Sequence, residues 1–196
     1  MVRPILSLFA FFLCITDLHA QIGCDVVQFK SLTAISKKDS IADKDFAVAV
    51  KLVKELERDK CTDYTGKKNG QDYVIATRTS LFGEICLRKN DQSAVQAYIN
   101  YMKRNDGSAD EQIALSFERI FQKQPQYVLS EIGYDEKLLN QLEWGFVNNH
   151  SENPHLTTKN YMEVFFKVNP KIKSIYPGHR KQIDYLLHVI YLELKR

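Results

Sequence analysis

The residues best suited to chemistry gather near the end of the chain, where four of the five histidines lie between positions 150 and 188. His150, Glu152 and His155 occur together in the segment HSENPH. Imidazole and carboxylate groups are common ligands of zinc, so this segment is a candidate metal site. However, Pro154 constrains the segment and no further ligand of matching spacing lies nearby. A solvated loop is therefore the simpler interpretation.

A second histidine–carboxylate pair lies in the last predicted helix. Asp184 and His188 are four residues apart and would share one helix face, where a simple ion pair explains them. His179 would lie in the first turn of the same helix. If this chain is an enzyme, it is a hydrolase or metal-dependent enzyme with a composite site in its C-terminal third, and the candidate residues are His150, Glu152, His155, His179, Asp184 and His188.

The sequence gives only weak indications of other catalytic or ligand-binding residues. The chain contains no P-loop, GxGxxG, HExxH, GxSxG or EF-hand motif, and no cofactor is predicted. Cys86 could serve as a nucleophile beside a histidine, but its setting in LFGEICL is typical of a small buried side chain. Trp144 could stack on a sugar, although a single Trp at helical spacing is more typical of a core edge. The sequence thus favours binding over catalysis.

The first twenty residues have the pattern of a secretory signal. Arg3 precedes the apolar run Ile5–Ile15, which is too short to span a membrane as a helix. Ala20 is a suitable residue for cleavage, so residues 1–20 are predicted to be a signal peptide and residues 21–196 a single soluble domain, secreted or periplasmic. A lipid anchor on Cys24 is disfavoured, because polar residues separate Cys24 from the apolar run: Asp17, His19 and Gln21.

Three cysteines would remain after this cleavage: Cys24, Cys61 and Cys86. If residues 24–36 form a helix antiparallel to a helix over 42–59, then Cys24 lies beside Cys61. Cys86 would lie about 21 Å from Cys61 along a helix axis, at about 1.5 Å per residue. A disulfide needs Cα atoms within about 7 Å. The sequence therefore predicts a Cys24–Cys61 disulfide, with Cys86 buried and free.

The net charge of +3 indicates no global electrostatic partner, and no nucleic-acid partner is predicted. Residues 159–196 are more basic, with eight Lys and Arg against three acids, interleaved with aromatic residues. This segment could bind an anionic polymer of the cell envelope, or it could be a solvated face whose aromatic side chains lie in the core. Asn149 begins a glycosylation sequon, which matters if the source is eukaryotic.

Apolar residues recur at helical spacing over nearly the whole chain, which predicts an all-α fold of about seven helices. Asp91 and Asp135 are expected to cap helices, and so are Ser40 and Ser108, each with an acid three residues later. We expect a loop over 62–71 and a helix over about 72–88. The segment 24–36 is compatible with helix or strand.

Short connections favour antiparallel neighbours, and hence an irregular bundle or stacked α-hairpins. A degenerate solenoid also fits, although no residue pattern recurs in register. Such folds offer broad faces for macromolecules. We therefore expect a helical binding protein that engages another protein, in the manner of an immunity protein, an inhibitor or an adaptor.

Overall fold

The computed structural model describes residues 24, 26–68, 71–105, 111–150 and 160–193. Its described part is mostly helical and contains ten helices and one small sheet, so the all-α prediction fits broadly but the predicted helix count was too low. The helices are α2 (Val26–Ser36), α3 (Asp43–Arg58), α4 (Arg78–Lys89), α5 (Gln92–Arg104), α6 (Glu111–Lys123), α7 (Pro125–Ile132), α8 (Glu136–His150), α9 (Tyr161–Val168), α10 (Pro170–Ile175) and α11 (Arg180–Glu193).

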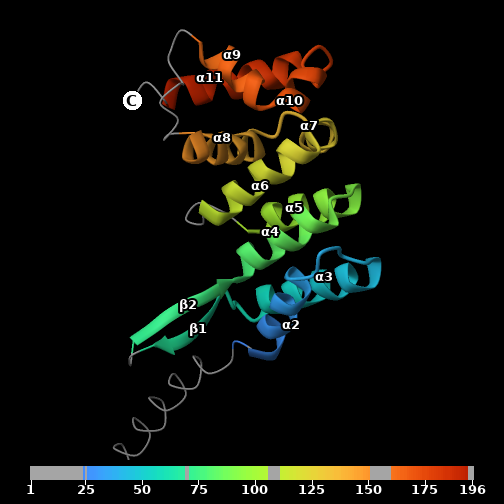
Figure 1. Cartoon of the computed structure of the whole chain (residues 1–196), viewed down its shortest axis with the longest axis vertical. Coiled ribbons are helices and arrows are strands. Elements are labelled where there is room, and N and C mark those ends of the chain that lie inside the picture. The colour runs from blue at the N-terminus through green and yellow to red at the C-terminus, as the bar shows by residue number, and fades with distance from the viewer. Residues whose placement is uncertain (1–23, 25, 69–70, 106–110, 151–159, 194–196) are drawn as a thin grey trace, which may run out of the picture.

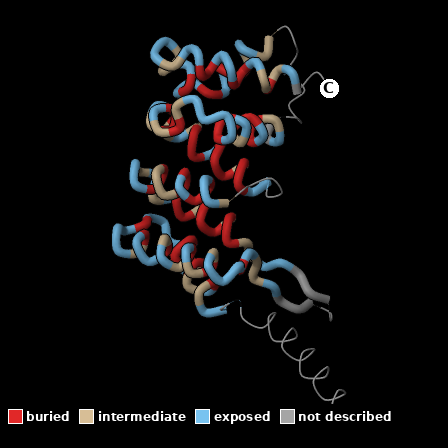
Figure 2. Tube along the Cα trace, turned by 180° about the vertical axis from the view of Figure 1, so that it is seen from behind, coloured by how far each residue is buried: buried red, intermediate tan, exposed pale blue. Residues whose placement is uncertain are grey.

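The helices stack in two layers (Figure 1). In the first, which we call the core layer, each helix packs on the next: α2 on α4, α4 on α6, α6 on α8 and α8 on α11. The second, which we call the outer layer, contains α3, α5, α7 and α10, and each of these packs on core-layer helices. Chain neighbours such as α2 and α3, or α4 and α5, thus form hairpins piled on one another. In Figure 2 the buried segments of these hairpins face one another along the middle of the stack.

Local sequence signals set several helix ends. The Asp91 carboxylate accepts a hydrogen bond from the Ala94 amide, and the Asp135 carboxylate accepts one from the Leu138 amide, as expected of N-caps. Pro125 and Pro170 each start a new short helix directly after another has ended, which raises the helix count. The predicted cap at Ser40 was wrong, because the N-cap position is Ala42, two residues later, and α3 starts at Asp43. Ser108 lies outside the described residues.

Small residues let the core-layer helices approach closely. A Cβ atom added at Gly145 of α8 would lie 2.5 Å from the Ala114 carbonyl oxygen and 2.6 Å from the Cβ atom of Glu118, both on α6. A Cβ atom added at Gly83 of α4 would likewise collide with the Ser116 side chain. Real atoms do not approach so closely, so glycine is required at both contacts.

A ladder of three basic side chains also joins core-layer helices to one another and to the outer-layer helix α10. Arg88 donates to the Lys38 carbonyl just after α2, at 3.1 Å, and Lys123 donates to the Leu87 carbonyl near the end of α4, at 3.0 Å. Lys171, at the start of α10, donates to the Lys123 carbonyl at 3.2 Å. The last carbonyls of a helix have no partner within it and carry partial negative charge, so a cation from a helix later in the chain stabilises them.

A β-hairpin replaces the loop that we expected over 62–71. Strand β1 (Asp63–Lys68) pairs antiparallel with β2 (Gln71–Thr77), and the hairpin extends away from the stack (Figure 1). The helix expected from residue 72 was wrong over its first turns, because α4 starts only at Arg78, where the Thr77 side chain caps it. The stretch Tyr73–Thr77 is rich in β-branched and aromatic residues, which favour a strand.

The cysteines lie where the sequence predicted. Cys24 and Cys61 are within disulfide distance, with their Cα atoms 5.3 Å apart, because α2 and α3 pack as a hairpin. Cys86 is a free, buried cysteine. Its burial raises the pKa of the thiol well above the usual value, and the nearby charge of Asp91 raises it further. None of the helices in the described ranges is both long and apolar enough to cross a membrane.

Candidate binding groove

Half of the predicted enzyme site lies beyond what the structure describes. Glu152 and His155 fall outside the described residues, and so does the side chain of His150, which is the last residue of α8. Within the described part of the chain, no group of three His, Cys, Asp or Glu residues could hold a metal ion. The enzyme interpretation therefore stays a prediction.

The other three candidate residues do not converge. Asp184 accepts a hydrogen bond from the Tyr176 hydroxyl at 2.7 Å and pairs with Arg180 at 3.4 Å, although we expected His188 as its partner. The hydrogen bond to Asp184 raises the pKa of Tyr176. His188 is exposed and lies nine positions after His179, about 13 Å along a helix at about 1.5 Å per residue.

His179 contributes to a structural contact. Its Nδ1 atom lies 2.9 Å from the Oε1 atom of Gln182, a buried residue. The Gln182 side-chain amide donates to the carbonyls of Leu129 and Gly133, at 2.9 and 2.7 Å. These carbonyls belong to the C-terminal end of α7, so His179 and Gln182 help to fasten α11 to the outer layer.

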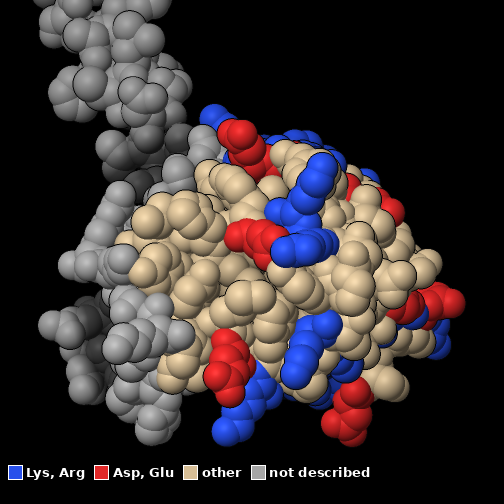
Figure 3. All heavy atoms as spheres, turned by 90° about the horizontal axis from the view of Figure 1, so that it is seen from above, with Lys and Arg blue, Asp and Glu red and all other residues tan. Residues whose placement is uncertain are grey.

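The basic C-terminal segment does not gather its charges on one face. Seen from above, this end of the stack carries both blue and red side chains, several of them next to each other (Figure 3). The Arg180–Asp184 pair neutralises part of the excess. Trp144, the other predicted contact residue, is half-exposed on α8. A small hollow of about 210 Å³ does adjoin the basic segment, but Lys171 is the one cation among its lining residues, which are Gln122, Val168, Asn169, Pro170, Lys171 and Ile172.

A groove lies between α3 and α5, where the outer layer opens. These two helices both pack on α4 but are not closely packed on each other. The groove has a volume of about 370 Å³. Apolar side chains form its floor, namely Phe46, Val50, Val53, Phe82 and Ala97, and polar ones form its rim, namely Lys54, Ser93, Gln96, Asn100 and Arg104.

The helical period explains why these residues meet. Ser93, Gln96, Asn100 and Arg104 recur every three or four positions, so they lie on one face of α5. Phe46, Val50 and Val53 line the facing side of α3 by the same rule. Phe82 reaches the floor from α4, whose side chains fill the space behind both helices. Three helices thus build the groove.

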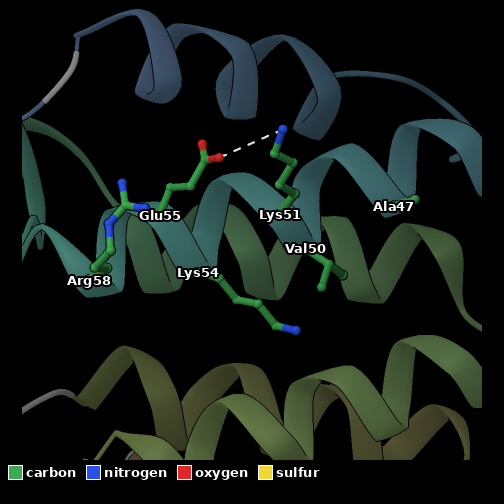
Figure 4. A pocket seen from close by; sticks show the side chains of 6 residues that line it. All are labelled: Ala47, Val50, Lys51, Lys54, Glu55 and Arg58. Carbon is green, nitrogen blue, oxygen red and sulfur yellow. Dashed lines mark ion pairs between the residues drawn. The ribbon is translucent and has the colours of Figure 1, made fainter.

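A second, shallower hollow continues the groove across α3 (Figure 4). Its volume is about 510 Å³, and Val50 and Lys54 line both hollows. In Figure 4 the Lys54 side chain points away from the Lys51–Glu55 ion pair and into the gap beside α3. The remaining lining residues are Ala47, Lys51, Glu55 and Arg58.

The rim of the groove carries two cationic side chains, and one of them is paired with a carboxylate. Its lining residues include Lys54 and Arg104 but no carboxylate. Arg104 is held in place by Glu57, with nitrogen–oxygen distances of 3.1 and 3.3 Å. Within the described part of the chain Lys54 makes no ion pair, so its charge is available to a ligand.

A buried arginine supports the groove from behind. Arg78 donates to the Cys61 carbonyl at 3.0 Å and to the Asn105 side chain at 2.9 Å, and its guanidinium lies over the Tyr101 ring. The Asn105 amide in turn donates to Glu57 at 2.7 Å, and Glu57 holds Arg104. This network connects the Cys24–Cys61 pair to the rim of the groove.

No family model matches this chain, and neither a curated protein nor a solved structure matches it. The interpretation of the groove as a binding site therefore depends on its geometry alone. Sequence reasoning missed it, because the rim residues look like any exposed polar helix face. The one available signal was the pair of amides at Gln96 and Asn100, flanked by Arg104, on the same face as the apolar Ala97.

Proposed function

We propose that this chain is a secreted or periplasmic binding protein that engages another protein through the groove between α3 and α5. One observation carries the proposal: the outer layer opens at this point, where the partly buried side chains of Val50 and Ala97 lie inside a polar rim that includes Lys54. A concave site of this kind, apolar within and polar at its edge, is typical of recognition sites.

The two-layered stack supports this function. Stacked helical hairpins behave as a solenoid, in which each layer contacts its neighbours and the exposed helices offer an extended surface to a macromolecule. An inhibitor, an immunity protein and an adaptor all need such a surface. The groove adds a defined anchor point within it.

The proposed compartment rests on residues 1–20 and on the cysteine pair. Proteins outside the cytoplasm form disulfides readily, and Cys24 and Cys61 are positioned to do so. N-terminal sequencing of the protein recovered outside the cytoplasm should begin at Gln21. A mature protein that still carries the apolar run Ile5–Ile15 would contradict the proposed cleavage.

The function is tested by filling the groove. We would capture partners of the tagged, disulfide-containing chain from its native compartment and quantify them by mass spectrometry. The variant Ala97→Trp should lose its specific partner, because the indole occupies the floor. The control Ala34→Trp makes the same change at an exposed position of α2, outside both hollows, and should retain it. Retention of every specific partner by a folded Ala97→Trp variant would contradict the proposal.

A further inference from the structure

The chemistry of the groove narrows the class of partner. Resting on the proposed function, we infer that the groove binds an acidic segment of the partner protein that carries a large apolar side chain. The partner contributes this side chain to the floor and carboxylates to the rim.

Charge is the first reason. The groove and the adjoining hollow are lined by four cations: Lys51, Lys54, Arg58 and Arg104. Three of them are paired, Lys51 with Glu55, Arg58 with Asp59 and Arg104 with Glu57, so Lys54 supplies the uncompensated positive charge. Glu55 is already engaged by Lys51 at 3.8 Å and by the Gln28 amide at 3.3 Å. A basic partner segment would meet repulsion here, whereas an acidic one gains attraction that also speeds its encounter.

The floor argues for a protein segment rather than an anionic polymer. Phe46, Val53 and Phe82 are buried in the core, and the partly buried side chains of Val50 and Ala97 supply the apolar surface that a ligand can cover. A polymer of sugars or phosphates has no apolar group to cover such a floor. At about 370 Å³ the groove lies at the small end of ligand sites, which suits one or two side chains.

The rim also matches a peptide backbone. Gln96 and Asn100 lie one turn apart on α5, and each carboxamide carries both donors and an acceptor. The α5 lining runs from Ser93 to Arg104, about 16 Å at about 1.5 Å per residue. An extended segment advances about 3.3 Å per residue, so about five residues of the partner would lie in the groove.

The test uses the full mature chain with its disulfide and a fluorescent peptide of about nine residues, in which glutamates flank a central phenylalanine. Binding is measured by fluorescence anisotropy at low and high salt. We expect this peptide to bind at least about tenfold more tightly than two controls, one with lysines in place of glutamates and one with serine in place of phenylalanine. Salt should weaken the binding of the acidic peptide.

A charge reversal in the protein completes the design. Lys54→Glu should weaken binding of the acidic peptide about tenfold. Lys44→Glu makes the same change on an exposed part of α3 that lines neither hollow, and should leave binding within about twofold. Both positions are exposed, so neither variant depends on repacking of the core.

The outcomes separate this inference from the proposed function. If the lysine peptide binds as tightly as the acidic one, the inference of an acidic partner is wrong, but the groove remains the proposed binding site. If the serine peptide or dextran sulfate binds as tightly, the ligand is an anionic polymer and the inference fails. A dimer in sedimentation analysis that Lys54→Glu dissociates would make a second copy the occupant, which also overturns it. If no peptide binds and Ala97→Trp retains the native partner, both the inference and the proposed function fail.

Discussion

The core layer and the outer layer are built from the same kinds of helix, yet they differ in how tightly they close. Along the core layer every helix packs on the next, and Gly83 and Gly145 bring the backbones close together. Along the outer layer α5 packs on α7 and α7 on α10, but α3 and α5 leave the groove between them. The core layer therefore supplies stability, and the outer layer has surface left for a partner.

The two layers are held together by a few specific ties at the N-terminal end of the stack. Cys24 precedes a core-layer helix and Cys61 follows an outer-layer one. Arg78, on the core-layer helix α4, donates to groups that follow α3 and α5. Because these ties lie beside the groove, changes to them should affect both stability and binding.

The largest expected effect comes from the disulfide. The variant Cys24→Ser frees a loop with a sequence separation of 37 residues, and the chain-entropy model gives a loss of at most about 4 kcal/mol in the free energy of unfolding. Urea denaturation would measure it, with the reduced wild-type protein as the matching control. Equal midpoints for the oxidised and reduced wild type would show that this tie does not stabilise the stack.

Removal of the buried Arg78 side chain should have the second largest effect on stability. Arg78→Met leaves the Cys61 carbonyl and the Asn105 side chain without their charged donor, at an expected cost of about 3 kcal/mol. Arg88→Met, an exposed position on the same helix with one hydrogen bond to a carbonyl, should cost about 1 kcal/mol or less. Chemical denaturation compares the two. Similar losses for both would mean that the Arg78 network is not a special tie between the layers.

A change within the core layer should have an intermediate effect. Gly145→Ala forces α6 and α8 apart, and overpacking of this kind should destabilise the protein by about 2 kcal/mol. In the control Gly178→Ala the added Cβ would lie 3.8 Å from the Ile175 carbonyl oxygen, an ordinary contact, so we expect a change within about 0.5 kcal/mol. Thermal unfolding distinguishes them. If Gly145→Ala proved neutral, the core layer would be looser than its geometry indicates.

The smallest expected effect concerns the cap of the outer-layer helix α5. Burial would raise the pKa of Asp91, but hydrogen bonds from Lys89, Ser93 and the Ala94 amide together lower it. A lowered pKa in the folded state contributes stability above the unfolded value, about 3.9, and loses it as the pH falls through the folded value. Asp91→Asn keeps the cap but removes the charge, so it should cost less than about 1 kcal/mol at neutral pH.

This difference between wild type and Asp91→Asn should close as the pH falls below about 4. Denaturation of both proteins from neutral to acidic pH would measure it. A difference that persists unchanged at about pH 2 would exclude the ionised carboxylate as its source.

Features set by a short stretch of chain could be predicted from the sequence. The pairing of Cys24 with Cys61 follows from the lengths of two helices, and the caps at Asp91 and Asp135 follow from one residue each. The hairpin was missed because Val74, Leu81 and Ile85 also fit a helical period, which hid the change from strand to helix at Thr77. Asn69-Gly70, a dipeptide typical of hairpin turns, was the signal that could have found it, although both residues lie outside the described part of the chain.

The groove could not be predicted in the same way. Its two sides, Val50 and Asn100, are fifty positions apart. The hollow exists because α3 and α5 both pack on α4 but contact each other closely only near their C-terminal ends, where Arg104 pairs with Glu57. Periodicity assigns a face to each helix but not the distance between two helices. For the same reason the sequence did not indicate that Arg78 is buried.

The ladder of basic side chains has a consequence for how the chain is completed during synthesis. Each carbonyl in the ladder receives its cation from a residue that lies 36 to 50 positions later in the sequence. A ribosome makes the chain from its N-terminus, so water hydrates each of these carbonyls until the residue that supplies its cation has been made and folded. Each of the three contacts therefore forms only after a further 36 to 50 residues have been made, and a chain that ends before its donor residue lacks that contact.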